Sequence, residues 1–370
     1  MIFSKRGAIY LKNRTIIKSL TRTLRNKTIL ERAGLSARAY LTPSANHTLA
    51  IFPDTLQAST YVQDFKTLYP DRNIYLLNEL PLTSRTDGLN ALLLERGATL
   101  RHWLNTKGVL AATPGALMSS CLIGGEELNI KRTEKFDAER VKSWLEMSGY
   151  KRSNLVWSPG QYVQRGFILD VFDPSYALPL RFEFFDDELE RVGSFRPDTQ
   201  KSSLELMALG DIVLHGLQKA ESRLPREILP NDTLILLNDP EKIETQAESF
   251  MWLWGEIYFE VRNFYEVEQW HKVFHELAQF PVIRITGDPE KSDTEIATET
   301  LPAFRGNPES ILQICDELHG HGYSVDVYTN NPVFQKLPYD IHGGILSAGF
   351  IDREAKRVFI SERELNTRLA

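Results

Sequence analysis

The spacing of apolar residues changes near residue 121 of this 370-residue chain, and this change constrains the fold more than any other feature. Before it, the pattern predicts short apolar strands and amphipathic helices in turn: strands at 48–54, 74–77 and 109–112, and helices at 55–68, 89–94 and 99–104. Pro114 and Gly115 stop the last of these strands. Because strands that alternate with helices form parallel sheets, the first third of the chain is predicted to be parallel α/β.

After residue 121, apolar and polar residues alternate with a period of two, which is typical of strands with one buried face. One amphipathic helix is predicted at 136–149, followed by strands at 161–172, 180–185 and 189–195 separated by short turns. This is typical of a small antiparallel unit. Further segments follow it: strands within 213–237, helix within 242–277, helix at 310–319, strand at 324–328, and a hairpin that pairs 345–350 with 357–360.

These changes of pattern divide the chain into parts. We predict an α/β protein in which a small antiparallel β-rich α+β domain is inserted into a parallel α/β domain. The predicted boundaries are 1–121 and 213–302 for the two parts of the parallel domain, 122–212 for the inserted domain, and 303–370 for a final small α/β domain.

The charge of the chain is unevenly spread. Residues 1–33 carry nine Lys and Arg and one Glu, whereas the whole chain has a net charge of −6. Apolar residues at helical spacing from Ile16 to Leu24 lie opposite basic ones, which predicts an amphipathic basic helix within 14–32. A nucleic-acid arm, a membrane-surface helix, a transit peptide, and an ordinary opening helix packed by its apolar stripe all fit this pattern.

No apolar run approaches the roughly 20 residues that span a bilayer, so a membrane protein is not expected. The two cysteines, Cys121 and Cys315, cannot build a disulfide framework and match no metal-binding spacing. We therefore expect a protein of the reduced cytoplasm.

Motifs for catalysis are absent from the sequence. A phosphate-binding loop needs Gly-Lys-Ser/Thr, which does not occur, and the nearest candidate is the small-residue turn at 34–38. Phe184–Glu188 resembles a Walker B strand only superficially, because Asp186-Asp187 is typical of a hairpin turn. His271 and His275 have a chelating spacing but no third ligand. We expect no catalytic residue, no cofactor and no metal, and hence no enzyme in this chain alone.

The strand predicted at 180–185 carries the most functional information. Alternation places Leu180, Phe182 and Phe184 on one face, which is the core face, and leaves Arg181 and Phe185 on the other. Arginine and an aromatic residue on a polar sheet face have the composition of a binding hot spot. Alternatively, the helix at 136–149 covers that face and buries Phe185. Whether Arg165 joins this face depends on the strand register, which the sequence leaves open.

The surrounding residues resemble a known family. The runs Gly160–Phe172, Pro179–Glu188 and Ser194–Ser202 are similar to the amino-terminal module of the bacterial transcription-repair coupling factors, which is itself similar to the excision-repair protein UvrB. Weaker similarity extends to 34–39, 301–307, 349–350 and 360–365.

The resemblance implies a fold and a partner. It implies a degenerate helicase-like α/β domain that has lost ATP binding, with an inserted domain that binds UvrA, the damage-recognition ATPase. The family positions used for UvrA binding match Arg165, Arg181 and Phe185. The resemblance thus implies a non-catalytic adaptor that recruits UvrA in transcription-coupled nucleotide excision repair.

Two other functions stay open. Relatives place an RNA-polymerase-binding domain, a DNA translocase motor and a domain that masks the UvrA surface downstream of the position of Ala370. The chain is therefore alternatively the front part of an ATP-dependent DNA translocase, which contacts RNA polymerase or DNA only through those domains. A third interpretation is direct nucleic-acid binding by the basic helix, which would weaken steeply with salt.

Overall fold

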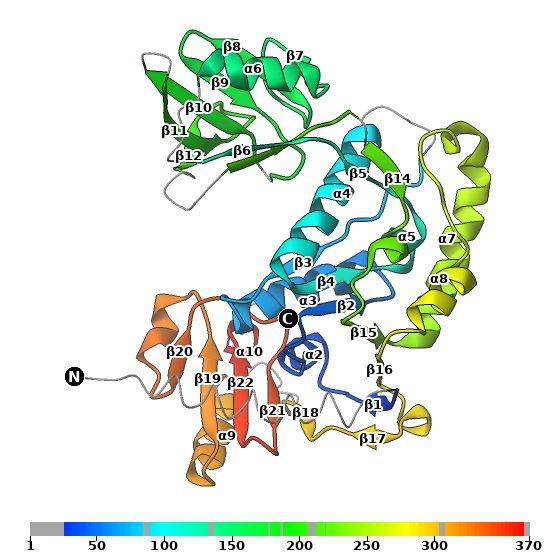
Figure 1. Ribbon diagram of the computed structural model, residues 1–370. Coiled ribbons are helices and arrows are strands. Elements are labelled where there is room, and N and C mark those ends of the chain that lie inside the picture. Colours follow the sequence, from blue (N-terminus) through cyan, green and yellow to red (C-terminus); the bar gives the residue numbers. More distant parts are fainter. Residues whose placement is uncertain are drawn as a thin grey trace.

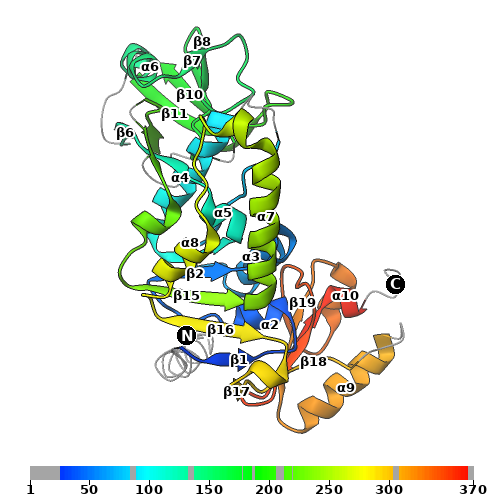
Figure 2. The ribbon, with the colours of Figure 1, turned by 90° about the vertical axis from the view of Figure 1, so that its right-hand side faces the viewer.

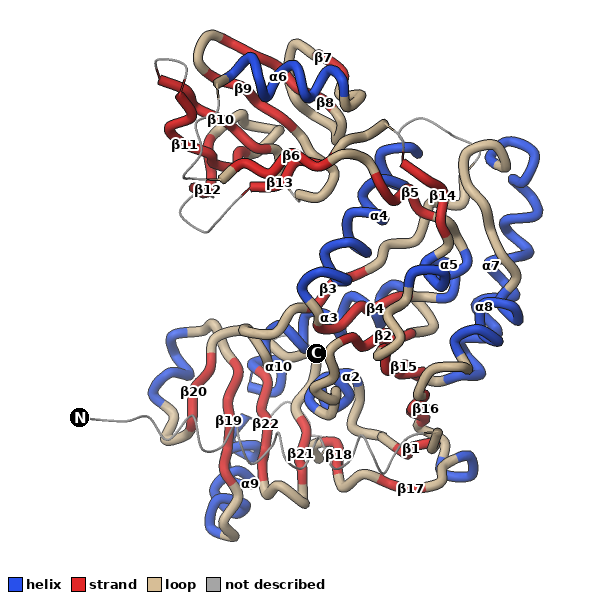
Figure 3. Tube along the Cα trace, in the orientation of Figure 1, coloured by secondary structure: helices blue, strands red, loops and turns tan. Residues whose placement is uncertain are grey.

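The computed structural model describes residues 26–83, 89–131, 137–176, 178–185, 188–205, 212–218, 220–302 and 308–365 (Figure 1). Within them the protein is mixed α/β, with one parallel sheet, several antiparallel pairings, and helices on the sheet faces (Figure 3). The predicted α/β class is therefore confirmed at this level.

A seven-stranded parallel sheet forms the centre of the largest unit. Its strand order is β17-β1-β16-β15-β2-β4-β3. The strands are β17 (Thr294–Glu295), β1 (Thr28–Leu30), β16 (Val282–Thr286), β15 (Thr233–Asn238), β2 (His47–Ile51), β4 (Gly108–Ala112) and β3 (Ile74–Leu76). Every residue of β2 and β15 is buried, which explains their continuous apolar runs. The strands predicted at 48–54, 74–77 and 109–112 are confirmed to within a few residues.

Helices cover both faces of this sheet and form a separate core on each. One face packs against α2 (Leu35–Tyr40) and α3 (Thr55–Leu68). The other packs against α4 (Leu89–Thr106), α5 (Pro114–Met118), α7 (Pro240–Val261) and α8 (Trp270–Leu277). The bounds of α3 match the prediction, because the Asp54 side chain accepts a hydrogen bond from the backbone N–H of Gln57 (2.8 Å) and caps its first turn.

Two predictions in this unit were wrong in detail. The helices at 89–94 and 99–104 are one helix, α4, which continues through Gly97. A Cβ at Gly97 would overlap the carbonyl group of Leu122, so the glycine allows a neighbouring strand to lie against the helix. The predicted end of the strand before Pro114 is confirmed, and Pro114 is also the first residue of α5. The basic helix does not reach residue 32, because 28–30 form β1, and residues 14–25 lie outside the described residues.

The chain leaves the parallel sheet and returns to it along one narrow connection (Figure 1). The outgoing strand β5 (Cys121–Gly124) pairs antiparallel with the returning strand β14 (Ala220–Arg223). Beyond them β6 (Glu127–Ile130) pairs with β13 (Ile212–His215). We call residues 127–215 the small unit, and Figure 1 shows it at one end of the molecule, next to the end of α4.

The described residues of the small unit form a six-stranded sheet of order β12-β11-β10-β9-β8-β7 and the helix α6 (Ala138–Met147). The strands are β7 (Lys151–Arg152), β8 (Gln161–Arg165), β9 (Ile168–Val171), β10 (Leu180–Phe185), β11 (Glu188–Phe195) and β12 (Ser202–Glu205). All neighbours are antiparallel except β7 and β8. The strand predicted at 161–172 was wrong, because it is a hairpin that turns at Gly166-Phe167.

A five-stranded sheet of order β18-β21-β22-β19-β20 forms the carboxy-terminal unit. Its strands are β18 (Thr298–Thr300), β21 (Phe350–Asp352), β22 (Arg357–Ser361), β19 (Ser324–Tyr328) and β20 (Asp340–His342), and its helices are α9 (Pro308–Gly320) and α10 (Glu362–Leu365). The predicted helix and first strand are confirmed. The predicted hairpin is shorter, since only Phe350–Asp352 pairs with Arg357–Phe359.

This carboxy-terminal unit packs against α2 and α3, to the right of the parallel sheet in Figure 2. The contact has an apolar part, in which Tyr40 meets Phe350 and Phe359. It also has a polar part, in which the Asp64 carboxylate accepts hydrogen bonds from the Ser347 backbone N–H (2.7 Å) and hydroxyl (2.5 Å). None of the described helices is long and apolar enough to cross a bilayer.

Candidate docking surface on the small unit

Strand β10 separates a core face from an outer face, as its alternation predicts. Leu180, Phe182 and Phe184 are buried and belong to the same apolar core as α6. Helix α6 therefore covers the core face. The alternative in which this helix buries Phe185 is wrong, because the Phe185 side chain is 65% exposed.

The strand register shows which residues share the outer face. Arg165 on β8 lies opposite Ile168 on β9, and Ile168 lies opposite Glu183 on β10. The next row joins Val163, Asp170 and Arg181 in the same way. The register thus brings Arg165 onto the face that carries Arg181 and Phe185, a question that the sequence left open.

Part of the outer face is covered by other side chains. Val163 and Phe195 pack with Val156 and the neighbouring Phe172 in a small apolar cluster on this side of the sheet. The rest of the face, with Arg165, Ile168 and Phe185, reaches solvent. We define the outer patch as the exposed Arg165, Phe167, Ile168 and Phe185 together with the half-buried Glu183.

The Arg181 side chain is held by contacts with other residues of the small unit. Its Nε and Nη2 atoms donate hydrogen bonds to the two carboxylate oxygens of Asp170 (2.7 and 2.9 Å), and Nη1 donates to the carbonyl of Gln200 (3.2 Å). Its guanidinium carbon also lies 4.5 Å from the centre of the Phe195 ring. The hydrogen bonds that Arg181 donates to Asp170 raise the pKa of Arg181, so this cation stays charged. Arg181 therefore cross-links β9 and β10 at the border of the outer patch.

Arg165 is much less restrained. Its side chain is exposed at the end of β8, where Nη2 donates one hydrogen bond to the carbonyl of Asn154 (3.3 Å). A guanidinium has five N–H donors, so Arg165 retains the capacity to bind a carboxylate of a partner in a bidentate way.

Sequence reasoning missed two members of the outer patch. Phe167 is 68% exposed and Ile168 is 38% exposed, and both were assigned to the interior of one long strand. The signal that could have found them is Gly166, which has φ of +58° and occupies the first central position of a two-residue hairpin turn. Asp186 and Asp187, beyond Phe185, lie outside the described residues.

A buried carboxylate fixes the base of the small unit. Asp173 accepts hydrogen bonds from the Tyr150 hydroxyl (2.9 Å), the Ser175 backbone N–H (2.8 Å) and the His215 backbone N–H (2.5 Å). Burial alone would raise the pKa of Asp173, but the interactions with His215 and Ser175 outweigh it and hold that pKa below its usual range. This network joins the loop after β9 to β13.

The small unit matches a known family. Residues 128–210, which make up most of the small unit, match the family model of the UvrB interaction domain. The chain is also 27% identical over 237 residues to the transcription-repair-coupling factor of Escherichia coli (strain K12), covering 57% of this chain and 20% of that protein. The predicted resemblance to transcription-repair coupling factors is confirmed.

Other relatives have the same name. The transcription-repair-coupling factor of Bacillus subtilis is 24% identical over 225 residues, or 56% of this chain and 19% of that protein. That of Haemophilus influenzae is 28% identical over 129 residues, or 34% of this chain and 11% of that protein. The chain thus matches about a fifth of the length of the first two transcription-repair coupling factors.

The loop before α2 is the position at which the resemblance places a Gly-rich turn. Its backbone N–H groups at Ala33 (2.6 Å) and Gly34 (3.3 Å) donate to the side-chain oxygens of the buried Glu31. Glu31 also accepts a hydrogen bond from Arg38, whose guanidinium pairs with Asp239 at the end of β15 (3.0 Å). The Glu31 carboxylate therefore accepts hydrogen bonds from backbone N–H groups of the kind that bind the phosphate in a phosphate-binding loop.

The remaining candidates from the sequence are the histidine pair and the two cysteines. His271 and His275 lie on α8, and no group of three or more metal-ligating side chains occurs in the part of the chain that the structure describes. Cys121 and Cys315 are buried, and burial raises the pKa of each thiol to about 12.

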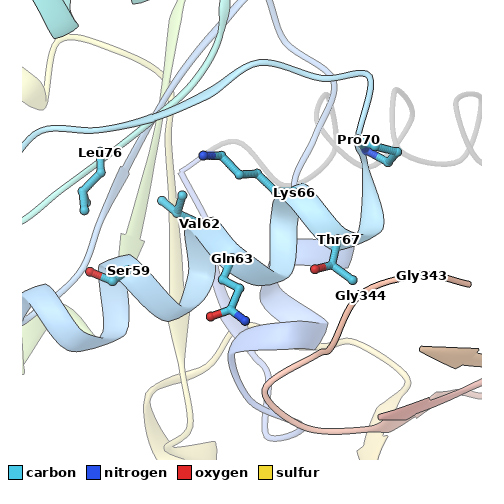
Figure 4. Close-up of a pocket in the computed structure, with 9 residues that line it drawn as sticks. All are labelled: Ser59, Val62, Gln63, Lys66, Thr67, Pro70, Leu76, Gly343 and Gly344. Carbon is cyan, nitrogen blue, oxygen red and sulfur yellow. The ribbon is translucent and has the colours of Figure 1, made fainter. Parts of the chain in front are cut away.

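An open groove of about 600 Å³ lies between α3 and the loop at Gly343-Gly344 (Figure 4). Its lining includes Val62, Leu76 and Lys66, and Lys66 is the only charged residue among the nine that form it. The groove is next to α3, which packs on the parallel sheet, and none of its lining residues belongs to the outer patch.

Proposed function

We propose that this chain is a non-catalytic adaptor that binds UvrA through the small unit and recruits it in transcription-coupled nucleotide excision repair. The observation that carries this proposal is the exposed Phe185 ring on the same sheet face as the exposed Arg165, inside the region that matches the UvrB interaction domain. A well-ordered aromatic side chain on a rigid sheet buries a large area on binding and loses little entropy.

The three proposed contact residues differ in how they act. Phe185 is the apolar anchor, and Arg165 supplies a charge-assisted hydrogen bond to a carboxylate of UvrA. Arg181 borders the patch on the same face of β10 as Phe185, and its pairing with Asp170 holds β9 and β10 together.

The rest of the chain is proposed to be a degenerate helicase-like frame. In this proposal 1–121 and 213–302 form one domain around the parallel sheet, 122–212 is the inserted UvrA-binding domain, and 303–370 is a separate small domain. The pairing of Glu31 with the loop before α2 supports a frame that does not bind nucleotide, because the loop donors already have an anionic partner.

Titration calorimetry of the full chain with purified UvrA tests the function. Phe185→Ala and Arg165→Ala are each expected to weaken binding by at least about 1–2 kcal/mol, as the loss of hot-spot residues does. Leu56→Ala, which removes an exposed apolar side chain from α3, is the matched control and should bind as the wild type does. Wild-type affinity in both patch variants, with unchanged thermal midpoints, would overturn the proposal.

A further inference from the structure

We propose that Phe167 and Ile168 form a second apolar contact for UvrA, so that the docking surface extends from β10 to the β8–β9 hairpin. This inference rests on the proposed function, and it adds two residues of the outer patch that the resemblance does not assign. Phe185 then is one end of the contact rather than its only apolar centre.

The strand pairing places these residues next to the proposed contacts. Ile168 lies between Arg165 on β8 and Glu183 on β10, in one row across three strands. The turn is tied to β10, because the backbone N–H of Phe184 donates to the carbonyl of Phe167 (2.9 Å). Since Phe184 directly precedes Phe185, the two exposed aromatic residues belong to adjoining positions at the same end of the sheet.

The exposed apolar area favours a contact surface. A folded protein seldom leaves several large apolar side chains together in water unless they serve an interaction. Here Phe167 and Phe185 each keep about two thirds of their surface exposed, and Ile168 adds a further exposed apolar group. Burying them against a partner removes this area from water without any change in the fold of the small unit.

The hairpin is also preorganised. Gly166 has a positive φ of +58°, which glycine adopts without strain, and the turn connects two paired strands after only two residues. A short turn that is anchored on both sides loses little freedom when it binds, so its contacts contribute to affinity with a small entropic cost.

The charges around the patch define the surface that fits it. Arg165 lies on one side of Ile168, whereas Glu183 on the other side is close to Arg191, with 3.9 Å between Oε1 and Nη1. The excess charge of this row is therefore positive. We infer that the matching face of UvrA has an apolar recess for Phe167 and Phe185, with a carboxylate within reach of Arg165.

The test compares variants of the full chain in titration calorimetry with purified UvrA. Phe167→Ser and Ile168→Thr are each expected to weaken binding about 5–30-fold, with thermal midpoints unchanged because both side chains are exposed. Phe167→Lys should weaken it at least as much. Met147→Ser is the matched control, because Met147 on α6 is 71% exposed and belongs to the helix that covers the core face.

The outcomes separate this inference from the proposed function. If Phe185→Ala and Arg165→Ala weaken binding but the Phe167 and Ile168 variants do not, the contact ends at β10 and the inference is wrong. If none of these variants changes the affinity, UvrA does not bind this face, and the proposed function fails as well. An equal loss in Met147→Ser would also overturn the inference, since the effect would then be unspecific.

Discussion

Replacing Arg181 with alanine is expected to destabilise the small unit before it affects any partner. Arg181 and Asp170 are directly opposite on β10 and β9, and two hydrogen bonds join them (2.7 and 2.9 Å). The Asp170 side chain is 3% exposed, whereas that of Arg181 is 15% exposed. Without the guanidinium, the carboxylate stays buried and loses its cationic partner.

The size of the effect follows from this burial. Removing one partner of a fully buried ion pair costs about 3–5 kcal/mol. Arg181 keeps some contact with solvent, which lowers this cost, while the lost stacking of its guanidinium on Phe195 adds about 0.5–1 kcal/mol. We therefore expect Arg181→Ala to lower the free energy of unfolding of the small unit by about 2–4 kcal/mol.

Hydrogen exchange of the full chain measures the local loss of stability in peptides that cover β8 to β10. Exchange in these peptides should accelerate in Arg181→Ala and change little in the peptides of β2 and β15. The double variant Asp170→Asn with Arg181→Met removes both charges and should recover part of the protection. If Arg181→Ala keeps wild-type protection, the ion pair has no structural role, and a loss of UvrA binding in that variant would then reflect a direct contact.

Three further predictions follow from buried polar groups. The folded-state pKa of Asp173 lies below the value of about 3.9 of an unfolded chain. The ionised Asp173 therefore stabilises the fold above that pH, and this stabilisation is lost as the pH falls through the folded-state pKa. In urea titrations, Asp173→Asn should reduce the decrease in the free energy of unfolding at acidic pH. Cys121 and Cys315 should not react with a thiol reagent at pH 8 until the chain is unfolded, because both pKa values are about 12. Arg96, whose pKa burial lowers to about 10, donates hydrogen bonds to the carbonyls of α5; Arg96→Met should therefore lower the free energy of unfolding by at least about 2 kcal/mol, measured by urea denaturation.

Sequence patterns predicted best the elements whose signals are local. Helix α3 has a capping aspartate at one end and regular apolar spacing, and β10 alternates strictly, so their bounds follow from the sequence. The β8–β9 hairpin was missed because a turn of two residues preserves the period of two on both sides. Helix α4 was predicted as two helices because Gly97 is a poor helix former. The structure shows that a side chain at this position would overlap the carbonyl of Leu122, which is distant in sequence.

In the candidate site, too, local features were predictable from the sequence, whereas contacts between strands were not. Alternation alone placed Phe185 opposite the core residues of β10, and the structure agrees. The partner of Arg181 was not predictable, because Asp170 precedes it by eleven residues and only the register between β9 and β10 makes them neighbours. The membership of Arg165 in the outer patch depended on register in the same way.

The two faces of β10 separate folding from docking. Phe182 is fully buried in the core with α6, so Phe182→Ala should cost about 3–5 kcal/mol and disturb the whole sheet. Phe185 makes no contribution to that core, so its replacement by alanine should leave the free energy of unfolding within about 0.5 kcal/mol of the wild type. Urea titrations of both variants check this contrast, and a large loss of stability in Phe185→Ala would show that its ring supports the fold. Because only Phe185 leaves the fold unchanged, a loss of UvrA affinity in that variant can be attributed to the contact itself.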